Sequence, residues 1–348
     1  MKAPEARGPI SSLLLRSLNQ RPDAAGSSVN GDLAAALEQS RTALSATGEL
    51  LFDDDLQLTL FCLYELHYLG IDGVDEAWEW HPLLLQLRAE IEHRFEQVLR
   101  ETVPVPERPP VNADAVAETL FALAADDSGP SLSRFVAQKA TREHLDEFLI
   151  QRSIYQLKEA DPHSWAIPRL TGRAKAALVE IQADEYGGGD PGRMHSVIFG
   201  MTMRGLDLDD SCGAYIDDVP AITLASVNMM SMFGLHRRLR GAIAGHLAAF
   251  EMTSSIPNRL YGKGFRRHGF DSEVTWYFDE HVEADAVHEQ IAARDLAGGL
   301  AEAEPTLLDD ILFGASACLT IDGMVGAQML EAWADGRSSL RSRQHSLV

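Results

Sequence analysis

Cysteine is scarce in this chain of 348 residues, and its three cysteines, Cys62, Cys212 and Cys318, lie far apart without a CxxC pair. Structural zinc sites depend on clustered cysteines, and disulfide-stabilised secreted proteins depend on several pairs of them, so neither class is expected. The start of the chain also lacks the positive and apolar segments of a secretory signal. We therefore expect a protein of the reducing cytoplasm.

Positive charge is in short supply as well. The chain has 30 Lys and Arg against 52 Asp and Glu, which gives a formal net charge of -22. Such a chain opposes binding to a phosphate backbone and offers no basic patch to anionic lipids, so nucleic acid and membrane surfaces are not expected as partners. The longest apolar stretch, residues 311–330, contains Asp322, Gln328 and many small residues, which favours a closely packed core helix over a membrane span.

The sequence motifs of several common enzyme classes are missing too. A GxSxG elbow, a Walker loop and a GxGxxG after a strand are all absent, so nucleophilic serine chemistry and dinucleotide binding lack their local supports. No alternation of apolar and polar residues is long enough to build a sheet. Helical spacing of apolar residues instead predicts an all-α fold, over residues 32–46, 54–68, 82–98, 113–125, 131–139, 141–160, 172–186, 192–205, 219–262, 272–303 and 306–335.

Breaks in this helical pattern suggest how the chain is organised. Residues 1 to about 28 have no periodicity and are expected to form a mobile arm. The Pro-rich run 103–111 predicts a semi-rigid connection, which would separate an arm with accessory helices (1–110) from the main domain (111–348). The long stretch 219–262 is expected to bend or break near Gly234.

Two histidines and an aspartate share one face of a predicted helix. With about 100° between successive residues, His281, Asp285 and His288 fall on a single stripe. Two imidazoles and a carboxylate directed at one point form a half-site for a divalent metal such as iron, manganese or zinc. The alternative is a solvated acidic face with two chance histidines, and this spacing alone does not decide between them.

Two further clusters add carboxylates and a histidine. Pro162 disfavours helical geometry at the residue before it, which places Glu159 in the last turn of a helix. Glu185 is followed by Tyr186 and then by three glycines, and His195 follows Pro191, so Glu185 and His195 are expected at the end of one helix and the start of the next. Carboxylates can bridge two cations, and imidazoles favour iron over magnesium or calcium.

In order and spacing, these six residues resemble the ligand pattern of the haem-oxygenase-like di-iron oxidases and oxygenases, an iron-containing redox enzyme family. The resemblance implies a haem-oxygenase-like bundle of about seven core helices, here with an N-terminal helical extension. It also implies two iron ions without haem, dioxygen as co-substrate, and metal-binding and catalytic roles for Glu159, Glu185, His195, His281, Asp285 and His288.

The same resemblance suggests a small organic substrate, often an amino acid, amine or fatty acid. Of the outcomes it implies, namely N-oxygenation, desaturation and oxidative C–C cleavage, we favour N-oxygenation of an amine or amino acid, by analogy alone. The sequence leaves open whether the protein uses an external electron donor and whether it forms a homodimer. The alternative function is that of a non-catalytic helical protein that binds metal or serves as an interaction module.

For several residues near the six ligand positions, the sequence allows two alternative roles. Asp161 and His163 could support the metal ligands or simply form a turn. Aromatic residues one turn from the ligands could line a substrate cavity, although such residues more often belong to the core; these are Tyr155, Trp276 and Tyr277. Arg152 and Arg169 could bind a substrate carboxylate or form surface ion pairs. The three glycines before His195 predict that metal binding orders residues 183–200, the alternative being a rigid turn.

Overall fold

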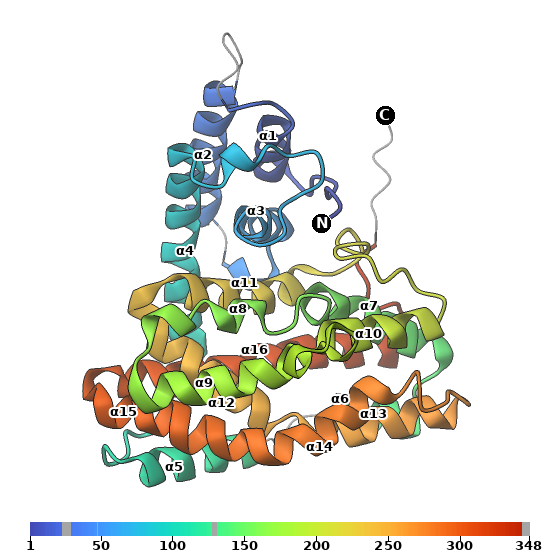
Figure 1. Cartoon of the computed structure of the whole chain (residues 1–348). Helices are drawn as coiled ribbons and strands as arrows, with labels where there is room; N and C mark the ends of the chain where they lie inside the picture. Colours follow the sequence, from blue (N-terminus) through green and yellow to red (C-terminus); the bar gives the residue numbers. More distant parts are fainter. Residues whose placement is uncertain (23–28, 47, 127–130, 343–348) are drawn as a thin grey trace. The chain divides into compact units, whose positions relative to one another are not determined.

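The computed structural model describes residues 1–22, 29–46, 48–126 and 131–342 (Figure 1). These ranges contain helices and no strands, which confirms the all-α class. The chain forms two compact units. The first consists of Met1–Thr102, Ser211–Met229 and the residues from Leu340 onward, and the second consists of Val103–Asp210 and Met230–Ser339. The expected division of the chain near residue 110 stays a prediction.

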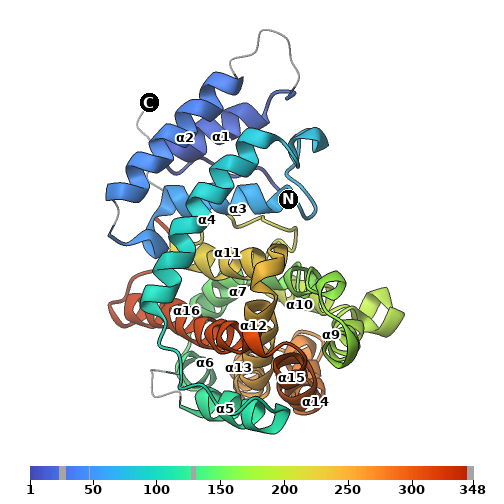
Figure 2. The same ribbon diagram turned by 90° about the vertical axis from the view of Figure 1, so that its left-hand side faces the viewer.

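The first unit is built on four helices that pack against one another: α1 (Pro9–Leu18), α2 (Val29–Ala46), α3 (Asp54–Glu65) and α4 (Pro82–Thr102) (Figure 2). The expectation of a mobile arm is wrong for α1. Ile10, Leu14 and Leu18 lie four residues apart and bury one face of this helix. The Asp55 carboxylate accepts hydrogen bonds from the backbone N–H groups of Ile10 and Ser11, each at 2.8 Å, and so stabilises the start of α1.

The other polar groups of this unit have structural roles. Asp53 caps α3 by accepting a hydrogen bond from the Leu56 N–H at 2.9 Å. His67 is buried, and its Nδ1 lies 3.2 Å from Glu79. His93 is exposed on α4, so it lies on the surface of this helix and outside the core.

The second unit contains the shorter helices α5 (Ala113–Ala125), α6 (Leu132–Gln138), α7 (Arg142–Gln156), α8 (Asp161–Ser164), α9 (Gly172–Glu185) and α10 (His195–Gly205). They are followed by α12 (Arg240–Met252), α13 (Ser255–Arg267), α14 (Trp276–Gln290), α15 (Gly299–Ala303) and α16 (Leu308–Ala334). A π-helical segment, Ile291–Gly298, joins α14 to α15. Helix α11 (Ala221–Leu235) ends just after Gly234, which confirms the expected break there.

Helices α12 and α16 pack closely at the core of this unit. A side chain on Gly245 would collide with the backbone carbonyl of Ile311, and one on Gly314 would collide with that of Ala242. Glycine is therefore required where these two backbones approach each other. The prediction of a closely packed core helix at 311–330 is confirmed for residues 311–318, all of which are buried. The segment Pro305–Ala334 is the one described helix whose length and composition would also suit a membrane span, and half of its most apolar window is buried.

Candidate metal centre

Glu185 is the last residue of α9 and His195 is the first residue of α10, as the sequence predicts. The connection turns at Gly187, Gly188 and Gly189, all of which have positive φ. At Gly187 an added Cβ would lie 2.8 Å from the backbone of the segment ahead of α10, so this position tolerates no side chain. The turn brings the Nδ1 of His195 to 3.0 Å from the Oε2 of Glu185.

Glu159 does not lie in the last turn of a helix, contrary to the prediction. Helix α7 ends at Gln156, and Glu159 sits in the turn that follows. Asp161 begins the short helix α8, because proline is tolerated in the first turn of a helix, where its missing N–H leaves no bond unmade. The Glu159 side chain is buried, with 5% of the residue exposed, and the Tyr277 hydroxyl donates to its two oxygens at 2.8 and 2.9 Å.

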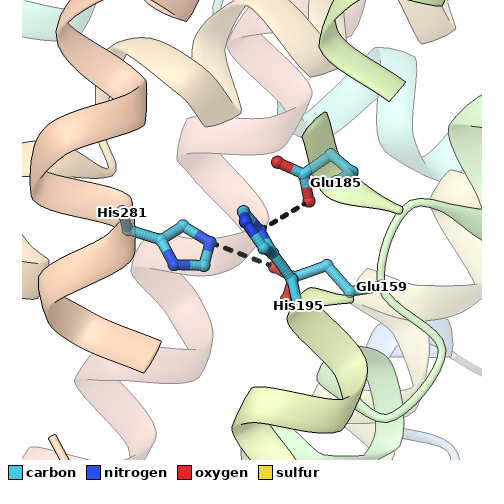
Figure 3. Close-up of side chains that lie close together, drawn as sticks. All are labelled: Glu159, Glu185, His195 and His281. Atoms are coloured by element: carbon cyan, nitrogen blue, oxygen red, sulfur yellow. Dashed lines mark ion pairs between the residues drawn. The ribbon is translucent and has the colours of Figure 1, made fainter. Parts of the chain in front are cut away.

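The ring of His281 is oriented by its own helix. Its Nδ1 lies 2.7 Å from the backbone carbonyl of Tyr277, one turn earlier in α14. A carbonyl can only accept a hydrogen bond, so Nδ1 carries the proton and Nε2 is the basic nitrogen. This Nε2 lies 3.6 Å from Glu159 Oε1, and the ring lies 4.4 Å, centre to centre, from that of His195 (Figure 3).

Two groups of side chains meet here. The first consists of Glu159, Glu185, His195 and His281, whose ligand atoms all lie within 4.8 Å of one another (Figure 3). The second consists of Glu185, Glu251 and His288, within the same limit. All these residues are buried, and Glu185 belongs to both groups. The structure thus brings together five of the six predicted residues.

Glu251 was missed by the sequence analysis. It lies on α12, and 5% of the residue is exposed. The available signal was a single acidic residue in the otherwise apolar run LeuAlaAlaPheGluMet, because a carboxylate is rarely buried without a partner. Asp285 lies within α14, but its side chain is outside the described residues, so its role stays a prediction.

His288 has the opposite ring orientation to His281. Its Nε2 lies 2.9 Å from Asp184 Oδ2, whereas its Nδ1 faces Glu251 Oε2 at 3.7 Å. Asp184 is largely exposed, with 61% of its side chain accessible, and it accepts a hydrogen bond from the outer nitrogen. A carboxylate that holds one nitrogen of a histidine while the other nitrogen faces inward is the usual support of a metal ligand.

The electrostatics of the cluster suit a cation. Burial opposes a charged Glu185, but His195, His281 and His288 hold the pKa of its carboxyl below the ordinary value. Burial likewise opposes protonation of His288, yet Glu251 and Asp184 raise its pKa to about 9. The Nδ1 atoms of His195 and His288 are buried without a hydrogen-bond partner of normal geometry. Buried nitrogens that face carboxylates in this way can bind a metal in place of protons.

An enclosed cavity of about 10 Å³ adjoins the cluster. Tyr155 and His163 help to line it, whereas Trp276 donates to Glu280 at 2.9 Å. Burial lowers the pKa of His163 well below the ordinary value, and its Nε2 lies 3.1 Å from the Nδ1 of His246. The cavity-lining residues do not include Arg152 or Arg169.

Comparison with known protein families agrees with this geometry. Residues 146–323, just over half of the chain, match the model of the family described as iron-containing redox enzymes. The chain therefore belongs to the iron-containing redox enzyme family, whose fold is helical. Every residue of the two buried groups lies within the matched range. A search of curated proteins finds no match.

Proposed function

We propose that this chain is an oxidoreductase that binds two iron ions and uses dioxygen to oxidise a small organic substrate. The observation that carries the proposal is the sharing of Glu185 between two buried carboxylate and histidine groups. A shared carboxylate is the natural bridge of a site with two metals about 3.5 to 4 Å apart. We assign the ligands to Glu159, Glu185, His195, His281, Asp285 and His288, and add Glu251.

The donor set favours iron over the metals that compete with it. Carboxylates and imidazoles in mixed coordination are typical of non-haem iron, whereas magnesium and calcium prefer oxygen ligands alone. Structural zinc favours cysteine, and the cysteines described, Cys62, Cys212 and Cys318, lie outside both groups. No porphyrin is required by this arrangement.

The protein's own residues prepare the site for redox chemistry. When bound, two ferrous ions would supply electrons for the reduction of dioxygen. Tyr277 holds Glu159 through both carboxylate oxygens, and Asp184 keeps the proton of His288 on the outer nitrogen. The rings of Tyr155 and Phe250 border the cavity and limit the access of water. An external donor would return the electrons after each turnover.

Among the reactions open to such a site, we favour N-oxygenation of an amine or amino acid. The described cavity lining contains acceptor oxygens from Glu159, Glu185, Glu251 and Gln182, and no Lys or Arg. This lining suits a nitrogen group that donates hydrogen bonds better than it suits a carboxylate or phosphate. Desaturation and oxidative C–C cleavage would place a hydrocarbon segment against the Gln182 oxygen, which is the lining acceptor not assigned to a metal, and would leave that oxygen unpaired.

Ferrous iron titration under argon, followed by oxygen addition, tests the proposal. We expect about two irons per chain and oxygen uptake that increases with a small amine or amino acid such as L-arginine or L-lysine. The double variant His281→Ala, His288→Ala should lose iron and oxygen uptake, whereas His93→Ala on the surface of α4 is the matched control. Full iron content in the double variant would refute the ligand assignment. Iron binding without oxygen uptake in the wild type would favour the non-catalytic alternative.

A further inference from the structure

Gln182 presents a buried acceptor without a donor beside the metal cluster. This residue lies on α9, one turn before Glu185, and 3% of it is exposed. Its Nε2 donates to the backbone carbonyl of Ala160 at 2.8 Å and to Ser164 Oγ at 2.7 Å. Because a carbonyl can only accept, these contacts determine which end of the amide is nitrogen. The other end, Oε1, is buried and has no hydrogen-bond partner among the described residues.

The surroundings of Gln182 indicate what could satisfy that oxygen. Gln182 lines the enclosed cavity together with Glu159, Glu185 and Glu251. The cavity has room for about one water-sized group, which is the size of a terminal nitrogen. A buried carbonyl oxygen without a donor destabilises the site until a donor arrives. An N–H group that enters the cavity would therefore meet a ready acceptor next to the metal cluster.

We propose that Gln182 determines substrate specificity by accepting, through Oε1, a hydrogen bond from an N–H of the substrate's reacting nitrogen. The substrate class is a primary ammonium group at the end of a short chain. This inference rests on the proposed function. Two bound ferrous ions would offset the charge of the surrounding carboxylates, so net charge alone discriminates little. A correctly placed acceptor does discriminate, because a substrate without the donor leaves it unpaired.

Gln182 also has a structural contact that the test must separate from this role. Through Nε2 it holds the Ala160 carbonyl, in the turn that follows Glu159. Loss of that contact would disturb the cluster for every ligand. Loss of the Oε1 acceptor would weaken only those ligands that donate an N–H. Two probes of equal chain length distinguish the effects: n-butylammonium, which has N–H donors, and butyronitrile, whose slim terminal nitrogen has none.

Calorimetric titration of both probes into the ferrous protein under argon is the experiment. Gln182→Met removes the acceptor, and Gln156→Met is the matched control, because Gln156 is a buried glutamine with an unpartnered Oε1 that does not line the cavity. We expect Gln182→Met to lose at least ten-fold more affinity for n-butylammonium than for butyronitrile, because loss of the Nε2 contact affects both probes and loss of the Oε1 acceptor affects only the first. Gln182→Glu, which keeps an acceptor oxygen, should retain the wild-type preference for n-butylammonium over the donor-free probe.

Three results would overturn the role of Gln182. These are an unchanged preference for n-butylammonium over the donor-free probe in Gln182→Met, an equal loss of affinity for both probes in that variant, and no binding of n-butylammonium to the wild type. An unchanged preference would mean that a buried water occupies the acceptor. The iron content, measured on the same samples, distinguishes this failure from that of the proposed function. Wild-type protein that binds no iron refutes the di-iron centre, whereas normal iron with an unchanged preference refutes only the role of Gln182.

Discussion

The Tyr277 hydroxyl is expected to control how tightly iron binds at Glu159. It donates to both oxygens of this buried carboxylate, at 2.8 and 2.9 Å. As a metal ligand, Glu159 would be a charged acceptor, and the Tyr277 hydroxyl would then donate to a charged carboxylate. The Tyr277→Phe variant should therefore lose more stability with iron than without it.

The size of this effect follows from the geometry. A buried hydrogen bond to a charged acceptor contributes about 1.5 to 3 kcal/mol. Residues that support metal ligands in this way typically change metal affinity about 10- to 100-fold when they are removed. We therefore expect Tyr277→Phe to weaken ferrous iron binding by about one to two powers of ten, with little loss of helix content.

Competition with a chelator of known affinity, under argon, measures this change. Tyr155→Phe is the matched control, because the Tyr155 hydroxyl accepts a hydrogen bond from the Ala160 N–H at 3.4 Å and makes no described hydrogen bond to a carboxylate. Circular dichroism checks that both variants fold. Equal iron affinity in Tyr277→Phe and the wild type would refute the reasoning, and so would an equal loss in both tyrosine variants.

Three further changes test other parts of the site. Asp184→Ala should weaken binding of the iron held by His288 by about ten-fold, because the proton of His288 is no longer held on the outer nitrogen. Two-step iron titration measures this change, and unchanged affinity in both steps would contradict it. Burial lowers the pKa of His246 to about 3, so the unfolded chain binds the extra proton between that value and about 6.5. The contribution of His246 to the stability of the metal-free protein should thus be full above about pH 6.5 and be lost on acidification at up to about 1.4 kcal/mol per pH unit, and urea unfolding of His246→Phe should show a shallower fall below pH 6.5. Gly187→Ala should destabilise the protein more than Gly188→Ala, because only at Gly187 would the added Cβ collide with backbone, and equal melting temperatures would disprove this.

The sequence by itself determined the helices of the site and most of the residues that meet in its two buried groups. The spacing of His281 and His288 places them on one face of a helix wherever that helix lies, and three glycines after Glu185 end a helix in any context. Such features depend on interactions between residues close in the chain. For the same reason the helical class and the break after Gly234 could be predicted.

Tertiary structure decided which remote side chains converge. Glu251 joins the cluster because α12 is positioned by its close packing against α16, which depends on glycines such as Gly245 rather than on any motif around Glu251. Glu159 reaches the site from a turn, held by Tyr277 more than a hundred residues away. Helix α1 forms although its sequence appears irregular, because Asp55 caps it from another helix. Contacts of this kind depend on how helices pack, and local periodicity carries no information about which distant residues will meet.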